Sequence, residues 1–98
     1  MESMNLFQLK NDLKPNEKLL IEKTDSKTIY LCRCRGEYSP EYFYKQKIII
    51  ILSGYIVFDT GGDEEKKFKE GDYVKIEDAE QCKIKNSDAL MITLIDEK

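Results

Sequence analysis

Histidine is absent from this chain of 98 residues. The absence excludes Ser-His-Asp and Cys-His nucleophile systems, general acid catalysis by imidazole near neutral pH, and every metal site with imidazole ligands. The three cysteines are an odd number, so they form no disulfide framework, and a thiolate metal site usually requires four ligands. The sequence therefore predicts a cytoplasmic protein with reduced thiols.

Long apolar runs and clustered charges are also missing. The longest apolar run, Ile48 to Leu52, is far shorter than the roughly 18–20 residues that a membrane span requires. No charged and then apolar leader opens the chain, so we expect neither membrane insertion nor secretion. The 16 basic and 19 acidic residues are interspersed, which argues against a nucleic-acid surface.

Short β-type segments are what the sequence has in abundance. Strands are expected over residues 18–22, 27–35, 66–70, 73–76, 82–85 and 89–95, with a turn at 86–88. Within 41–58, the run Ile48–Leu52 precedes Ser53-Gly54, and Tyr55–Phe58 follows at once. This pattern predicts two antiparallel strands joined by a glycine turn. Eight or so short strands, with turn signals about every 8–12 residues, indicate an all-β sandwich or small barrel.

The whole chain is expected to form a single domain, with 1–16 as an N-terminal segment and 17–98 as a barrel. Leu6, Leu9 and Leu13 have helical spacing, which predicts a short amphipathic helix packed on the barrel. Cys32 and Cys34 share one face of the 27–35 strand. We interpret them as small apolar core residues.

From Gly36 onward the chain resembles the cupin superfamily. The first cupin motif is a glycine, five residues, H-x-H, three or four residues, a glutamate, six residues and a glycine. Anchoring the last glycine on Gly54 places the glutamate position at Lys47 and the two histidine positions at Glu41 and Phe43. The resemblance implies an all-β fold, a small double-stranded β-helix or jelly-roll barrel with a short N-terminal helical or irregular segment.

The second cupin motif extends this resemblance from Gly71-Asp72. It reaches Cys82 at its histidine position and Asn86 at its asparagine position. Glu41, Phe43, Lys47 and Cys82 thus occupy the four positions that hold a metal in many cupins. We expect these four residues to line a ligand site that contains no metal and no cofactor.

Lys47 is the unusual residue at the start of an otherwise apolar strand. Periodicity alone leaves it either inside the barrel or outside as a snorkelling lysine. An inward lysine is costly unless it is paired, and desolvation lowers the pKa of such a group. Because strand alternation puts residues 41, 43 and 47 on one face, our hypothesis is that Lys47 replaces the metal cation and pairs with Glu41.

Two classes of function are compatible with these residues. The first is a non-enzymatic barrel that binds a small molecule or a protein partner, which the loss of every histidine favours. The alternative is a metal-independent isomerase, epimerase or lyase, with Lys47 as general base or Schiff-base amine, Cys82 as nucleophile or acid, and Glu41 as acid or base. A metal enzyme with the atypical ligands Glu41 and Cys82 also stays open.

If residue 47 faces inward, Ile48, Ile50 and Leu52 face outward. Other strands or a second subunit must then cover this row, because a bare apolar row invites aggregation. Many small cupins dimerise by packing or exchanging strands. We therefore expect a homodimer.

Overall fold

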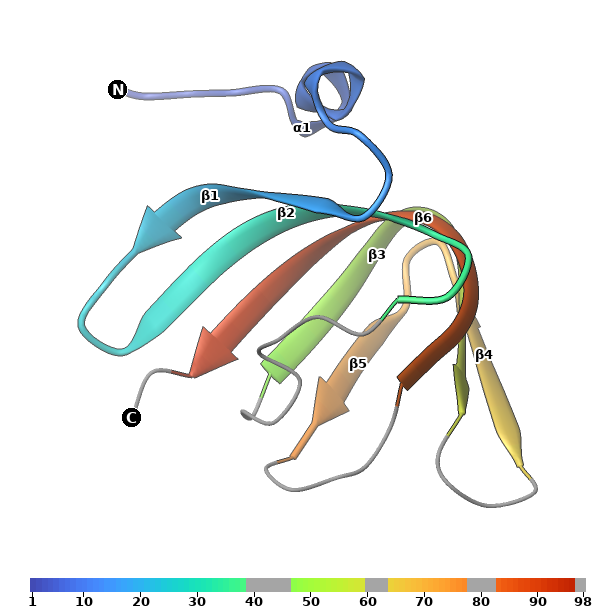
Figure 1. Cartoon of the computed structure of the whole chain (residues 1–98). Helices are drawn as coiled ribbons and strands as arrows, with labels where there is room; N and C mark the ends of the chain where they lie inside the picture. The colour runs from blue at the N-terminus through green and yellow to red at the C-terminus, as the bar shows by residue number, and fades with distance from the viewer. Residues whose placement is uncertain (39–46, 60–63, 78–82, 97–98) are drawn as a thin grey trace.

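The computed structural model describes residues 1–38, 47–59, 64–77 and 83–96. Its elements are α1 (Leu6–Leu9), the 3-10 turn η1 (Lys10–Asp12), β1 (Glu17–Lys23), β2 (Lys27–Arg35), β3 (Lys47–Asp59), β4 (Glu65–Lys69), β5 (Tyr73–Ile76) and β6 (Lys83–Asp96). The six strands form one antiparallel sheet in the order β1-β2-β6-β3-β4, and β5 pairs with β3 as well. The sheet is strongly curved, with the N-terminal helix above its convex side (Figure 1).

Two predicted turns are wrong. Ser53-Gly54 lies inside the continuous strand β3, and residues 86–88 lie inside the continuous strand β6. The two strands pair along almost their whole lengths, with Gly54 opposite Ala89 and irregularities in register after Ile51 and after Val57. A bulge of this kind bends a strand and increases its twist without ending it. The glycine that looked like a turn signal therefore marks a bend, and six strands replace the predicted eight in the described ranges.

The bulge also changes which residues of β3 face inward. Before it, Ile49 and Ile51 are buried in the main core, and after it Ile56 and Phe58 are. Ile56 follows Ile51 by an odd number of positions, whereas residues on the same face of a regular strand are an even number of positions apart. The alternation is therefore shifted by one residue at the bulge. A single alternation counted through the whole of β3 therefore fails at this point.

The main core lies on the inner, concave face of the sheet. There Cys32 and Cys34 of β2 pack among apolar residues of the other strands, in agreement with the predicted alternation of β2. The buried members of this cluster are Cys32, Cys34, Ile49, Ile51, Ile56, Phe58, Ile76, Ile84, Ala89 and Met91. These described residues thus form a buried core on the inner face.

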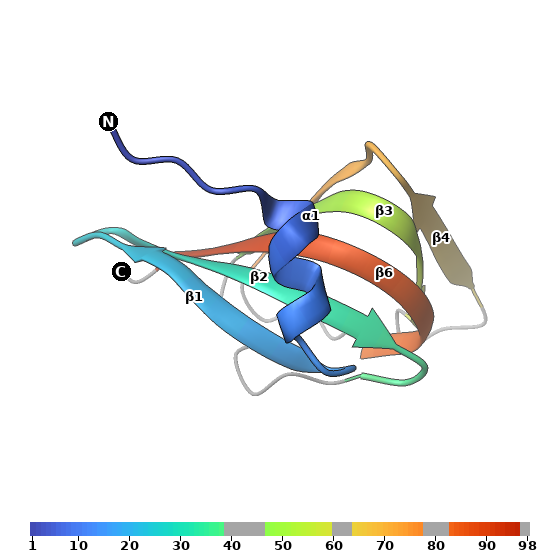
Figure 2. The same cartoon turned by 90° about the horizontal axis from the view of Figure 1, so that it is seen from above.

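The N-terminal segment covers part of the outer, convex face, as its helical spacing predicts. Asn5 caps α1, because its Oδ1 accepts hydrogen bonds from the Phe7 and Gln8 amides at 3.0 and 3.2 Å. Figure 2 shows α1 lying across the middle of β2 and β6. A second cluster forms under it, with Leu13, Leu31 and Leu90 buried and Leu6, Leu9, Ile21, Leu52 and Ile92 packed around them.

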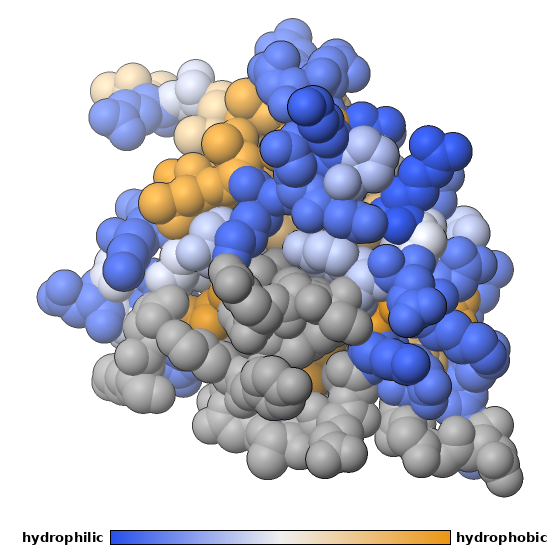
Figure 3. Space-filling model, in the orientation of Figure 1, coloured by the Kyte–Doolittle hydropathy of each residue, from blue (hydrophilic) through white to orange (hydrophobic). Residues whose placement is uncertain are grey.

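Apolar side chains remain partly exposed beyond the N-terminal segment. Figure 3 shows apolar surface gathered beside that segment. In the outer-facing row Ile48, Ile50 and Leu52, the N-terminal cluster includes Leu52, while Ile48 and Ile50 are half-buried. Leu19 and Tyr73, which lie opposite Leu31 and Ile50, are exposed.

Candidate functional site

Lys47 is the first residue of β3 and lies in the last described row of side chains at that end of the inner face. It pairs in register with Ile95 of β6 on one side and Ile76 of β5 on the other, and Thr28 of β2 lies beyond Ile95. The Lys47 residue is only 1% exposed. Of the two orientations that the sequence leaves open, Lys47 therefore takes the inner one, on the side of Ile49.

The other three predicted site residues, Glu41, Phe43 and Cys82, lie outside the described residues. The proposed pair between Lys47 and Glu41 stays a prediction. The part of the predicted site that the structure describes is Lys47 and the inner rows next to it.

The rows behind Lys47 become progressively apolar. The next row along β3 places Ile49 beside Thr93 and Val74. The Cys32 Sγ atom lies 3.8 Å from the Thr93 Oγ1 atom, and both residues are fully buried. Polar groups that are buried in this way need partners, and this contact supplies one.

Cys34 lies deeper on the inner face. Desolvation by burial raises the pKa of the Cys34 thiol far above its usual range, and the neighbouring Cys32 raises it further. A thiol held in the neutral form is a poor nucleophile and a poor metal ligand. The two cysteines therefore fit the predicted role of core residues.

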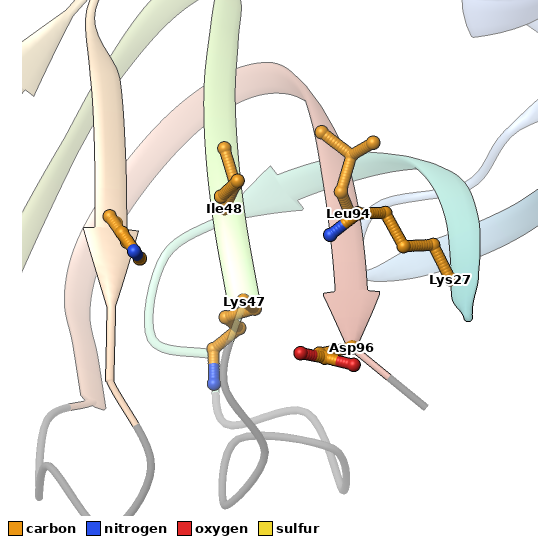
Figure 4. Close-up of a pocket in the computed structure, with 6 residues that line it drawn as sticks. Lys27, Lys47, Ile48, Leu94 and Asp96 are labelled. Atoms are coloured by element: carbon orange, nitrogen blue, oxygen red, sulfur yellow. The ribbon is translucent and has the colours of Figure 1, made fainter. Parts of the chain in front are cut away.

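A hollow of about 90 Å³ lies at the same end of the sheet as Lys47. Ile48 and Leu94 pair in register, Lys75 lies opposite Ile48, and Lys27 pairs with Asp96. Figure 4 shows the Lys47 ammonium pointing away from Ile48 and Leu94. The residues that line the hollow are Lys27, Lys47, Ile48, Lys75, Leu94 and Asp96.

Spacing and periodicity in the sequence do not single out Lys27, Lys75 and Asp96. Each is a charged residue at or near the end of an alternating strand, and such residues are usually no more than solvated strand ends. Their proximity depends on the register between β2 and β6 and between β3 and β5. Only knowledge of the strand pairing could have grouped them.

Within the described residues, no helix is long and apolar enough to cross a membrane.

No family model matches the chain, and no curated protein matches it. Solved structures do. A protein from Neisseria meningitidis has a TM-score of 0.75 at 17% identity, over 96% of this chain and 99% of that chain. A cupin-2 domain protein from Shewanella frigidimarina has a TM-score of 0.75 at 16% identity, over 92% and 91% of the two chains.

A third structure matches over the full length of both chains. This protein from Ralstonia eutropha, named as a proposed mannose-6-phosphate isomerase, has a TM-score of 0.78 at 12% identity over 100% of each chain. Others are named RmlC-like cupins or double-stranded β-helix proteins. Together with the curved antiparallel sheet, these similarities show that the chain has the double-stranded β-helix fold of the cupin superfamily.

Proposed function

We propose that this chain is a non-enzymatic, metal-independent binding module that holds a small anionic molecule near Lys47. The observation that carries the proposal is the position of Lys47: a cationic side chain, 1% exposed, in the outermost described row of the inner face. A buried ammonium group needs a partner, and Lys47 already interacts with a group of the protein. An anionic group on a ligand would add a further favourable charge interaction with this ammonium.

A metal ion does not fit this residue. A protonated amine has no lone pair to donate, and its charge repels a divalent cation at short range. In the cupin alignment, Lys47 stands where a glutamate ligand is usual. The chemistry of Lys47 therefore supports a barrel that works without a metal.

The chemistry of the inner face favours binding over catalysis. Behind Lys47, the described core consists of apolar side chains, buried thiols and Thr93, with Tyr30 and Tyr38 packed against it at its margin. The Cys34 thiol, with its raised pKa, offers no thiolate at neutral pH.

We propose that the protein works in the cytoplasm, where its thiols stay reduced.

Ligand-dependent thermal stability tests this proposal. The test panel contains inorganic phosphate, citrate, short carboxylates and mannose 6-phosphate, because one similar structure carries the name of an isomerase of that sugar phosphate. A ligand present at about 100 times its Kd stabilises the folded state by about 2.7 kcal/mol. We expect at least one anion to stabilise the wild-type protein and to lose that effect in Lys47→Met.

Two controls make the result specific. Lys83→Met removes an exposed lysine from the start of β6 and should leave the stabilisation unchanged. Uncharged analogues of the same ligands should have no effect on either protein. Equal stabilisation of wild type and Lys47→Met would contradict the proposal, and conversion of a stabilising ligand to a product, followed by proton NMR, would favour an enzyme.

A further inference from the structure

The hollow on the outer face has an apolar floor and charged walls. Ile48 of β3 and Leu94 of β6 pair in register, and both side chains are half-buried. Since side chains alternate along a strand, these two point to the face opposite Lys47. They form the floor of a depression of about 90 Å³.

Two lysines approach this floor from opposite sides. Lys75 extends the row on β5, directly opposite Ile48. Lys27 is the first residue of β2, and Figure 4 shows its side chain reaching towards β6, with the ammonium beside Leu94. The strand order places β3 and β6 between the strands that carry these two lysines.

One carboxylate completes the wall. Asp96, the last residue of β6, lies opposite Lys27 in the register between β2 and β6, and it lines the hollow. The Lys75 Nζ atom also lies 3.6 Å from the Glu77 Oε1 atom, but both side chains are about half exposed. An exposed pair of this kind contributes little and gives way readily to another anion.

We propose that this hollow binds a small organic acid that has a short aliphatic body and a hydroxyl group. The carboxylate lies between Lys27 and Lys75, where it accepts charge-assisted hydrogen bonds. The aliphatic body covers Ile48 and Leu94 and removes their exposed surface from water. The hydroxyl group donates to the Asp96 carboxylate, which also repels a second negative charge and so disfavours dicarboxylates and phosphate dianions.

The hollow adjoins the site proposed around Lys47, because Lys47 is one of the residues that line it. The Lys47 ammonium points away from Ile48 and Leu94, which form the floor. The variants of the wall therefore separate the two sites: Lys27→Gln and Lys75→Gln should weaken binding in the hollow and leave the stabilisation that depends on Lys47 unchanged. Binding that is unchanged in both wall variants would overturn the assignment to this hollow.

Three probes of similar shape test the chemistry. These are 2-hydroxyisobutyrate, isobutyrate without the hydroxyl group, and isobutyramide without the charge. Titrations are followed by the methyl NMR signals of Ile48 and Leu94, which report on the floor directly. We expect the hydroxy acid to bind with a Kd of about 1 mM, isobutyrate about threefold more weakly, and the amide at least tenfold more weakly.

Variants of the wall identify the groups responsible. Lys27→Gln and Lys75→Gln should each weaken binding of 2-hydroxyisobutyrate by about fivefold to tenfold, while Lys83→Gln should not change it. Asp96→Asn should reduce the preference for the hydroxy acid over isobutyrate. The proposal is overturned if the Ile48 and Leu94 methyl signals do not move, if the amide binds as well as the acid, or if Lys83→Gln weakens binding as much as the wall variants.

Discussion

Gly54 of β3 and Asp88 of β6 lie close together at the bend of these two paired strands. A Cβ atom placed on Gly54 would be 1.8 Å from the Asp88 carbonyl oxygen. Gly54 also has a φ of +83°, in the region that residues with a side chain rarely adopt. The bend that gives the sheet its curvature therefore depends on the absence of a side chain at position 54.

Gly54→Ala should destabilise the protein by about 3 kcal/mol or more, because the backbone of β6 must move to make room. Gly71→Ala is the matched control: its φ is +88°, but nothing lies within 4 Å of the added Cβ. That variant should cost only about 1–2 kcal/mol. Urea unfolding measures both values, and equal losses would show that the close approach at Asp88 is unimportant.

Arg33 fastens the N-terminal segment to the sheet. Its Nη1 donates a hydrogen bond to the Leu13 carbonyl oxygen at 2.8 Å, and Leu13 anchors the cluster beneath α1. Arg33→Met should cost about 1 kcal/mol and should raise amide hydrogen exchange over residues 6–13. Arg35→Met, two positions along β2 and exposed, should leave that exchange unchanged.

Burial of Cys34 predicts a dependence of stability on alkaline pH. The folded-state pKa of its thiol is raised above the ordinary value of 9.0, so the unfolded chain releases this proton first. The resulting stability is fully present below about pH 9 and is lost as pH rises further, by up to about 1.4 kcal/mol per pH unit. In Cys34→Ala the free energy of unfolding should fall less steeply between pH 8.5 and 10.5, and an unchanged slope would contradict this account.

Homodimerisation stays a prediction. The exposed Tyr73, 61% accessible, lies next to the half-buried Ile50 on the outer face. Sedimentation at micromolar concentration should give twice the mass of the chain, and Tyr73→Asp should shift it towards the monomer. Leu20→Asp is the control, because Leu20 is 52% exposed but lies opposite Tyr30 on the inner side of the edge strand. A monomeric wild-type protein would show the prediction to be wrong.

The fold class was predictable because alternation and turn residues are local properties of the sequence. The strand over 27–35 and the N-terminal helix follow directly from spacing. The predicted turns at Ser53-Gly54 and 86–88 failed because a glycine in a strand marks a bulge as readily as a reversal. Local sequence does not show which of these the partner strand imposes.

The candidate site was predictable only in part. Alignment on Gly54 selected Lys47, but the inward direction of this residue had to come from the structure. Lys27 and Asp96 are adjacent only because the first half of the chain pairs with its last strand. Such long-range register cannot be read from periodicity.

Metal content after exposure to metals tests the central claim most directly. The protein is incubated with an excess of Mn²⁺, Fe²⁺ or Zn²⁺ under reducing conditions, passed over a desalting column, and analysed for bound metal. With an ammonium at Lys47, we predict well under about 0.1 metal ion per chain. About one metal ion per chain, retained by the wild-type protein, would contradict the account of Lys47 as the residue that replaces the metal.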